Sequence, residues 1–168
     1  MQTTATLKNG LEVTVRDIRP DDRERLARAF RGLRRETVYT RFFRYVAELT
    51  DAQLRRATEF DAEHEVALVV TTGDASEEAI IAGGRYIASA EDPLAAEVAF
   101  LVEEDYQGQG IAGLLLRQLA DIARRHGVVR FEAEVLSENG SMLRVFSRSG
   151  MQMRQRREGG VVHVELSL

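Results

Sequence analysis

A glycine-rich segment, Tyr106-Gln107-Gly108-Gln109-Gly110-Ile111-Ala112-Gly113, lies between an apolar run at residues 98–102 and an amphipathic pattern that begins at Leu114. Glycines let another group approach the backbone closely, and the first N–H groups of a helix have no acceptor within the helix. Together with the positive end of the helix dipole, such N–H groups bind anions, phosphates in particular. The segment therefore predicts a site for a phosphorylated cofactor.

The string Gly108-Gln109-Gly110-Ile111-Ala112-Gly113 matches the GxGxxG pattern of dinucleotide-binding folds, and Glu134 lies roughly where an acid for the ribose is expected. In that fold, however, the glycines directly follow the first strand, whereas here residues 103–106 intervene and several elements come earlier. Too few residues follow to complete a doubly wound sheet, and no Gly-Lys-Ser/Thr makes a Walker A loop. A helix-opening turn without a ligand is the plain alternative, although such a turn rarely contains three glycines and a glutamine.

One acidic residue, Glu97, interrupts the apolar residues 95–100 just before the glycine-rich segment. In a strand, an acid in this context is either exposed by alternation or has a chemical task. A carboxylate in a cleft accepts a proton directly or through water, so Glu97 is the candidate general base. Glu132 and Glu134 are rival bases on another expected strand, where their alternation with apolar residues favours a solvated face.

The elements that must position these residues follow from the apolar pattern. Strands are expected at residues 66–72, 79–88, 97–102, 130–135 and 161–166, and an N-terminal hairpin at residues 5–16. The dipeptide Asn9-Gly10 in that hairpin favours a type I′ turn. Helices are expected from Pro20, from Thr50 or Asp51, at residues 111–126, and around residues 142–146 with an end at Gly150. The order ββααβββαβαββ predicts an α+β fold.

Composition narrows the class of protein. The 168 residues are 44% hydrophobic and 30% charged, which is typical of one soluble globular domain. A net charge of −4 gives no reason to expect a nucleic-acid partner, and no apolar run reaches membrane-spanning length. The absence of cysteine excludes disulfides and thiolate metal sites, and no spacing of His, Asp and Glu predicts a metal site. Without a secretory signal pattern, a cytoplasmic location is expected.

The segment Gln107-x-x-Gly110-x-Ala112 resembles the acetyl-CoA signature, Gln/Arg-x-x-Gly-x-Gly/Ala, of the GCN5-related N-acetyltransferases (GNAT). Downstream, Asn139 and Gly150-Met151 resemble the second half of that family's pattern, and the resemblance runs from about Leu11 onward. It implies a single GNAT domain over residues 1–168. In that fold a mixed, mostly antiparallel central sheet is flanked by helices, and a splayed strand pair holds acetyl-CoA.

A narrower resemblance, to the acetyltransferase domain of bacterial Pat-type protein lysine acetyltransferases, rests on flanking segments. These are Ile18-Arg19-Pro20-Asp21-Asp22, Arg41-Phe42-Phe43, Leu49-Thr50-Asp51, Ala67-Leu68-Val69, Ala96-Glu97-Val98-Ala99-Phe100 and Val135-Leu136-Ser137-Glu138-Asn139. The resemblance implies direct acetyl transfer to an amine in a ternary complex, with Glu97 as general base. The acceptor implied is a protein lysine, such as one on an acyl-CoA synthetase. Pat-type proteins often carry a cyclic-nucleotide or acyl-CoA-synthetase-like domain, for which this chain has no room, so such regulation is expected to be absent or to come from another chain.

The family resemblance also implies a set of cofactor-binding residues: Phe100, Leu101, Val102, Gln107, Gly108, Gln109, Gly110, Ile111, Ala112, Gly113, Asn139 and Phe146. Amides of residues 109–113 would face the pyrophosphate, and backbone groups of residues 100–102 would pair with pantetheine. Asn139 is expected either to bond the pantetheine or to cap the last helix. Phe146 stands where many members have a tyrosine general acid, so it is expected in the core or as a wall for the thioester. The thiolate then leaves unassisted or with the help of another residue.

Two other functions are consistent with the same residues: a small-molecule amine acetyltransferase, and a non-catalytic acyl-CoA-binding sensor or interaction module. Either a monomer or a homodimer is compatible with the sequence. Lys8 is the only lysine, while arginine is abundant. Genome composition is the plain explanation, and the alternative is that an enzyme acting on lysine avoids modifying itself.

Overall fold

A computed structural model of the chain describes residues 1–42, 44 and 46–168. Its strands are β1 (Gln2–Thr6), β2 (Glu12–Asp17), β3 (Glu65–Thr72), β4 (Ala79–Ala88), β5 (Ala95–Val102), β6 (Arg130–Leu136), β7 (Gln152–Glu158) and β8 (Val161–Ser167). Its helices are α1 (Arg23–Arg31), α2 (Arg35–Phe42), α3 (Asp51–Thr58), α4 (Ile111–Arg125) and α5 (Gly140–Ser147), with 3₁₀ turns η1 (Pro20–Asp22) and η2 (Glu104–Tyr106). Phe43, which belongs to one of the Pat-like segments, lies outside the described residues.

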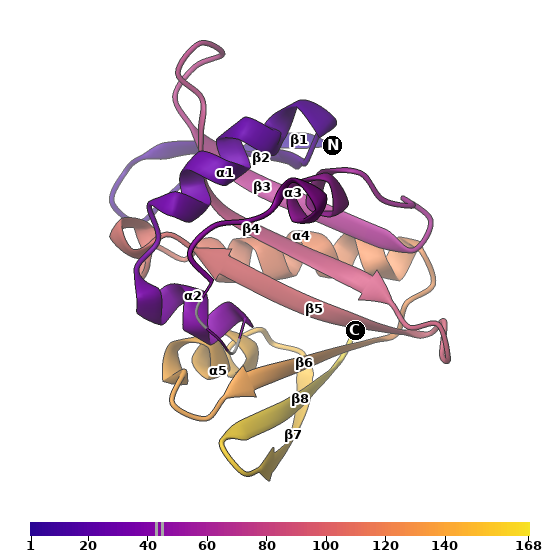
Figure 1. Cartoon of the computed structure of the whole chain (residues 1–168). Coiled ribbons are helices and arrows are strands. Elements are labelled where there is room, and N and C mark those ends of the chain that lie inside the picture. The colour runs from indigo at the N-terminus through magenta and orange to yellow at the C-terminus, as the bar shows by residue number, and fades with distance from the viewer. Residues whose placement is uncertain (43, 45) are drawn as a thin grey trace.

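The strands form one 8-stranded sheet in the order β1-β2-β3-β4-β5-β6-β8-β7 (Figure 1). Among the described residues, neighbouring strands are antiparallel except for β5 and β6, which are parallel. The predicted α+β fold with a mixed, mostly antiparallel sheet is therefore confirmed.

Helices cover both faces of this sheet. In Figure 1, α1, α2 and α3 lie in front of the sheet and α4 lies behind it. Side chains alternate between the two faces of a strand, so Val98 and Phe100 of β5 join the core under α4 while Glu97 points to the opposite face. Leu115 and Leu119, one turn apart on α4, are fully buried in that core. None of the described helices combines the length and hydropathy needed to cross a membrane.

The parallel strands β5 and β6 separate after a short ladder. Their pairing joins residues 95–97 to residues 130–132, whereas β6 remains paired with β8 as far as Leu136. Figure 1 shows the two strands diverging toward α2 and α5. The predicted splayed strand pair is confirmed, and no strand of the described residues covers this edge in the C-terminal half of β5.

The N-terminal hairpin is present, but the prediction of a type I′ turn at Asn9-Gly10 is wrong. The N–H of Gly10 donates to the C=O of Leu7 (2.9 Å), which makes Gly10 the fourth residue of the turn, with a φ of 87°. A type I′ turn would need Gly10 at the third position. The connection between β1 and β2 is therefore longer than two residues, and Lys8 lies within it.

Helix α2 was not predicted from the sequence. In the described residues three α-helices, not two, separate β2 from β3. Only Val38 and Phe42 of α2 are apolar at helical spacing, which is too short a pattern to reveal a period. The omission matters because α2 packs against β5.

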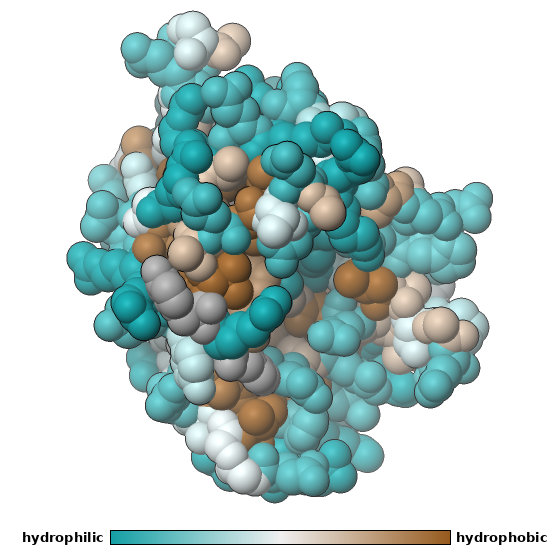
Figure 2. All heavy atoms as spheres, viewed as in Figure 1, coloured by the Kyte–Doolittle hydropathy of each residue, from teal (hydrophilic) through white to brown (hydrophobic). Residues whose placement is uncertain are grey.

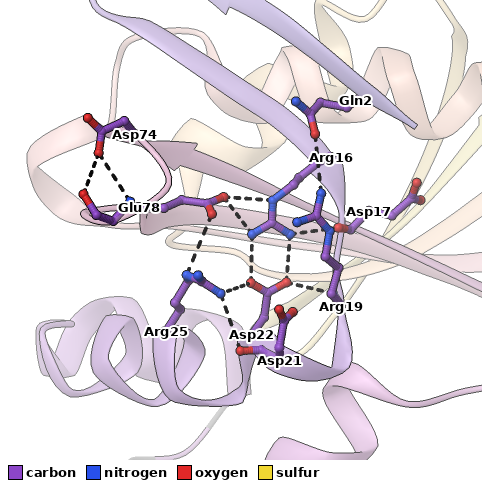
Figure 3. A network of polar contacts seen from close by, with 10 residues as sticks. Gln2, Arg16, Asp17, Arg19, Asp21, Asp22, Arg25, Asp74 and Glu78 are labelled. Carbon is purple, nitrogen blue, oxygen red and sulfur yellow. Dashed lines mark hydrogen bonds and ion pairs between the residues drawn. The ribbon is translucent and has the colours of Figure 1, made fainter.

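A buried ionic network anchors η1 to the sheet (Figure 3). Arg16 of β2 and Asp22 are 2% and 0% exposed, and two hydrogen bonds of 2.8 Å join the guanidinium to the carboxylate. Arg16 Nε also donates to Glu78 Oε1 (2.9 Å), and the N–H of Arg19 donates to Asp22 (2.7 Å). Burial would raise the pKa of Asp22, but the hydrogen bonds from Arg16 and Arg19 outweigh it and hold this pKa below its ordinary value. The network fixes where α1 begins.

Candidate active site

The glycine-rich segment links β5 to α4. Gly108 and Gly110 have φ angles of 78° and 89°, a left-handed conformation that favours glycine, and Gly110 is the N-cap of α4. Gln107 is engaged within the protein: its Nε2 donates to the C=O of Val102 (3.0 Å) and its backbone N–H to the C=O of Glu104 (3.2 Å). Gln107 therefore braces the loop against the end of β5.

The start of α4 presents a row of free donors. In the described part of the chain, the N–H groups of residues 108–113 donate to no protein acceptor, and no side chain of the N-cap residue Gly110 serves them. Leu114 is the first residue to bond within the helix, to the C=O of Gly110 (3.0 Å). Such a row of N–H groups at the positive end of a helix matches a phosphate or a diphosphate.

The C-terminal half of β5 turns backbone groups into the gap beside β6. The N–H of Glu103 donates to the C=O of Ile81 on β4 (2.9 Å), and backbone groups alternate in direction along an antiparallel strand. The N–H groups of Phe100 and Val102 therefore face the gap, whereas the backbone of Leu101 faces β4. Phe100 and Val102 fit the predicted pairing with an extended chain. Leu101 does not, because its backbone groups belong to the ladder with β4.

A groove of about 1360 Å³ follows this edge and passes the glycine-rich segment. It is lined by all the residues predicted to bind the cofactor, namely residues 100–102, residues 107–113, Asn139 and Phe146, and also by Glu97. Figure 2 shows apolar residues gathered in the middle of the face that α2 and β5 share. Sequence positions as distant as 97 and 146 thus line one groove.

The wall formed by α5 contains Asn139 and Phe146. Asn139 is the N-cap of α5, and its Oδ1 accepts from the N–H of Met142 (3.3 Å) and from Ser141 Oγ (3.2 Å). Of the two predicted roles of Asn139, the capping role is the one that its contacts support. Phe146 is 1% exposed, and its ring centroid lies 6.1 Å from that of Phe100. Phe146 is therefore a core residue at the floor of the groove.

Glu97 lies where the groove meets a second cavity, of about 400 Å³, on the open face of β6, β8 and β7. The two cavities share Glu97, Ala133 and Glu134. In the described residues, the Glu97 carboxylate takes part in no hydrogen bond or ion pair. Glu97 is therefore free to interact with a molecule that enters from either side.

The two rival bases have partners. Glu132 accepts from Arg130 Nε (3.1 Å), and Glu134 lies 3.4 Å from Nδ1 of His163. The Glu132 and Glu134 side chains are 50% and 57% exposed. They belong to a solvated face, as their alternation predicted, whereas Glu97 makes no hydrogen bond or ion pair with the part of the chain that the structure describes.

Arg41 is a groove residue that the sequence analysis missed. Burial, and then the charge of Arg85, lower the pKa of the Arg41 guanidinium, while the charge of Glu97 acts in the opposite direction. Arg41 therefore adds a positive charge near Glu97. Its only sequence signal was its place in a Pat-like segment, because α2 itself was not predicted.

A sheet that opens between two parallel strands, beside a helix start with free N–H groups, is the architecture of the GNAT acetyltransferases. Residues 12–152 match the family described as "Acetyltransferase (GNAT) domain", and the chain belongs to this family. The family resemblance predicted from the sequence is confirmed.

The resemblance to Pat-type acetyltransferase domains is confirmed as well. The chain is 34% identical over 154 residues to acetyltransferase Pat from Mycolicibacterium smegmatis. The aligned region covers 92% of this chain and 45% of that protein. Its structure matches the GNAT domain of S. lividans PAT with a TM-score of 0.90 and 36% identity, over 99% of this chain and 97% of that one. A cAMP-binding acyltransferase from Mycobacterium smegmatis matches with a TM-score of 0.69 and 30% identity, over 99% of this chain and 47% of that one. The chain thus spans less than half the length of these two mycobacterial proteins.

Proposed function

We propose that this chain is an N-acetyltransferase that uses acetyl-CoA and acetylates the side-chain amine of a protein lysine, with Glu97 as general base. One observation carries the proposal: Glu97, which makes no hydrogen bond or ion pair in the described residues, lies at the junction of two cavities. The large groove suits the acetyl donor, and the second cavity suits the acceptor. Two sites that meet at one carboxylate support direct transfer in a ternary complex.

The residues of the groove fit coenzyme A. The free N–H groups of residues 108–113 match its pyrophosphate, and the open edge at Phe100 and Val102 matches an extended chain of amides such as pantetheine. Bound there, acetyl-CoA supplies an activated acetyl thioester. Backbone N–H groups that face the gap are preorganised donors for a carbonyl oxygen, and they need no rearrangement to act.

Glu97 would remove a proton from the acceptor ammonium. A lysine side chain has a pKa of about 10.4, so a neutral amine at pH 7 costs roughly 4–5 kcal/mol unless a base removes the proton. The carboxylate reaches the amine directly or through water. Phe146 has no proton to donate, so this chain supplies no general acid at that position.

The second cavity favours a protein acceptor over a small amine. Its charged lining is open to solvent, with Glu132, Glu134 and Glu165 exposed to 50%, 57% and 43%. A small amine needs an enclosed pocket that excludes water, whereas a lysine on a protein surface needs an open approach. The relative from Mycolicibacterium smegmatis is named an acetyltransferase, which agrees with acetyl transfer as the reaction.

The test compares Glu97→Gln with Glu132→Gln, since these residues are paired in the β5–β6 ladder. We expect Glu97→Gln to bind acetyl-CoA within about threefold of the unmodified chain by calorimetry, while acetylation of lysines in a cell lysate falls by about 10²–10⁴-fold. Glu132→Gln should lower acetylation by less than about tenfold, because it removes a surface charge and no base.

Three results would overturn parts of the proposal. Binding of NADH without binding of coenzyme A would refute the cofactor. Unchanged turnover in Glu97→Gln would remove Glu97 from the mechanism. Tight binding of acetyl-CoA by the unmodified chain without acetylation of any lysine would favour a sensor over an enzyme.

A further inference from the structure

The single lysine of the chain lies beside the glycine-rich segment. The turn between β1 and β2 is held by buried Leu7, which is 6% exposed, and by a hydrogen bond from the N–H of Leu11 to Asn9 Oδ1 (3.1 Å). From this turn the Lys8 side chain extends to Gly110, where an added Cβ would lie 3.7 Å from Lys8 Cε. Lys8 therefore lines the same groove as the row of free N–H groups.

A second cation lies beside the first turn of α4. An added Cβ at Gly113 would lie 3.6 Å from a terminal nitrogen of Arg117, which is one turn further along α4 and lines the groove as well. Gly110 and Gly113 are the N-cap and third residue of α4, so the two glycines that the cations approach lie about one helical turn apart. Lys8 and Arg117 therefore reach the start of α4 from two different elements.

Neither cation is neutralised by another residue that the structure describes. Within the described ranges, Lys8 and Arg117 take part in no hydrogen bond or ion pair, although the chain has 27 acidic side chains and a net charge of −4. Many other arginines are paired, as Arg124 of the same helix is with Asp121 (2.8 Å). Two unpaired cations beside a row of unpaired N–H groups concentrate positive potential at one place in an acidic protein. Such a concentration suits an anion with more than one phosphate group.

We propose that Lys8 and Arg117 form a clamp on the phosphates of a nucleotide cofactor, and that Lys8 makes the N-terminal hairpin part of the cofactor site. The inference rests on the proposed function, because that function places coenzyme A in the groove. Coenzyme A carries two sources of phosphate, the pyrophosphate and the ribose 3′-phosphate. The clamp binds phosphate by charge, and comparison with dephospho-coenzyme A, which lacks the 3′-phosphate, tells which source each cation holds.

The experiment is calorimetry of coenzyme A and of dephospho-coenzyme A with the full chain and four variants. Lys8→Gln and Arg117→Gln remove one charge each, Lys8→Arg keeps the charge, and Arg124→Gln is the matched control on α4. We expect Lys8→Gln and Arg117→Gln each to weaken coenzyme A binding by roughly 5–30-fold at low salt. The loss should shrink as salt is raised, because exposed charges are screened. Lys8→Arg and Arg124→Gln should bind within about threefold of the unmodified chain.

Thermal unfolding without ligand separates a binding role from a structural one, since both charge-removing variants should unfold at the temperature of the unmodified chain. If Lys8→Gln weakens the binding of coenzyme A and of dephospho-coenzyme A equally, Lys8 holds the pyrophosphate. If it weakens the binding of coenzyme A alone, Lys8 holds the 3′-phosphate. Unaltered affinity in Lys8→Gln and Arg117→Gln, with tight binding by the unmodified chain, would overturn the clamp and leave the proposed function intact. Failure of the unmodified chain to bind either ligand would overturn the proposed function itself.

Discussion

Gly84 of β4 allows the core under the cofactor groove to close, and Gly84→Ala should destabilise the protein by overpacking. An added Cβ would lie 2.8 Å from Phe100 Cδ1, 3.0 Å from Phe100 Cε1 and 3.2 Å from Leu119 Cδ1. These neighbours cannot easily move, because Phe100 is 7% exposed, Leu119 is 0% exposed, and Phe146 packs against the Phe100 ring. Overpacking of this kind destabilises the folded state by about 1–3 kcal/mol. Replacing glycine with alanine also lowers the conformational entropy of the unfolded chain, which stabilises the protein by about 0.4–1 kcal/mol. We expect a net loss of about 1–2 kcal/mol.

Gly83→Ala is the matched control, since its added Cβ would point to the other face of the sheet. The nearest atom there is the C=O oxygen of Leu68, at 3.4 Å, which is an ordinary contact. In urea unfolding followed by circular dichroism, the free energy of unfolding of Gly84→Ala should therefore be about 1–2 kcal/mol below that of the unmodified chain. That of Gly83→Ala should lie within about 0.5 kcal/mol of the unmodified chain. In the double variant Gly84→Ala with Phe100→Val, the added methyl group fills space that the ring leaves. The free energy of unfolding that the double variant loses should therefore be at least about 0.5 kcal/mol smaller than the sum of the losses in the two single variants. Equal effects at the two glycines, or strict additivity in the double variant, would refute the argument from packing.

Three more predictions concern the ionic network and the cap of α5. Asp22→Asn removes one of the two carboxylates that pair with buried Arg16 and leaves only Glu78, so it should lower the free energy of unfolding by up to about 3–5 kcal/mol in urea titrations; a loss under about 1 kcal/mol would contradict this. The pKa of Asp22 is lower in the folded than in the unfolded state, where it is near 3.8, so its stabilisation is complete above that pH and is lost as the pH falls through the folded-state pKa. The free energy of unfolding should therefore decline below about pH 4 more steeply in the unmodified chain than in Asp22→Asn, as measured by urea titrations at several pH values. Asn139→Ala removes the cap of α5 and should cost about 1 kcal/mol in urea titrations, whereas Asn139→Asp keeps the cap and its stability; if acetyl-CoA affinity falls equally in both variants, Asn139 also contacts the cofactor.

The parts of the site that the sequence predicts are those with local signals. The glycines, the apolar strand before them and the stripe of α4 lie within about 30 consecutive residues, and each follows from propensity or periodicity. Glu97 stood out because it interrupts an apolar strand. The structure adds that Glu97 makes no hydrogen bond or ion pair in the described residues while Glu132 and Glu134 each make one, a difference that alternation alone does not reveal.

The parts that the sequence does not predict depend on contacts between distant positions. Lys8 and Gly110 are more than one hundred positions apart, and nothing in either local pattern indicates that the N-terminal turn meets the start of α4. Arg41 was missed because its helix is short and weakly patterned. The turn at Asn9-Gly10 was assigned from a dipeptide preference, but the hydrogen bond from Gly10 to Leu7 selects a longer turn.

The separation of β5 from β6 also bears on how this protein avoids aggregation. Most sheets confine their unpaired strand edges to the two outermost strands, where charges, prolines and bulges discourage pairing with other molecules. Here an additional edge opens in the interior of the sheet, and the proposed cofactor site requires that it stay unpaired and reachable. Neither a charge nor a proline can block this edge without blocking the groove. Figure 1 shows α2 and α5 near the place where the two strands diverge, so these helices are placed to hinder the approach of a further strand from another molecule.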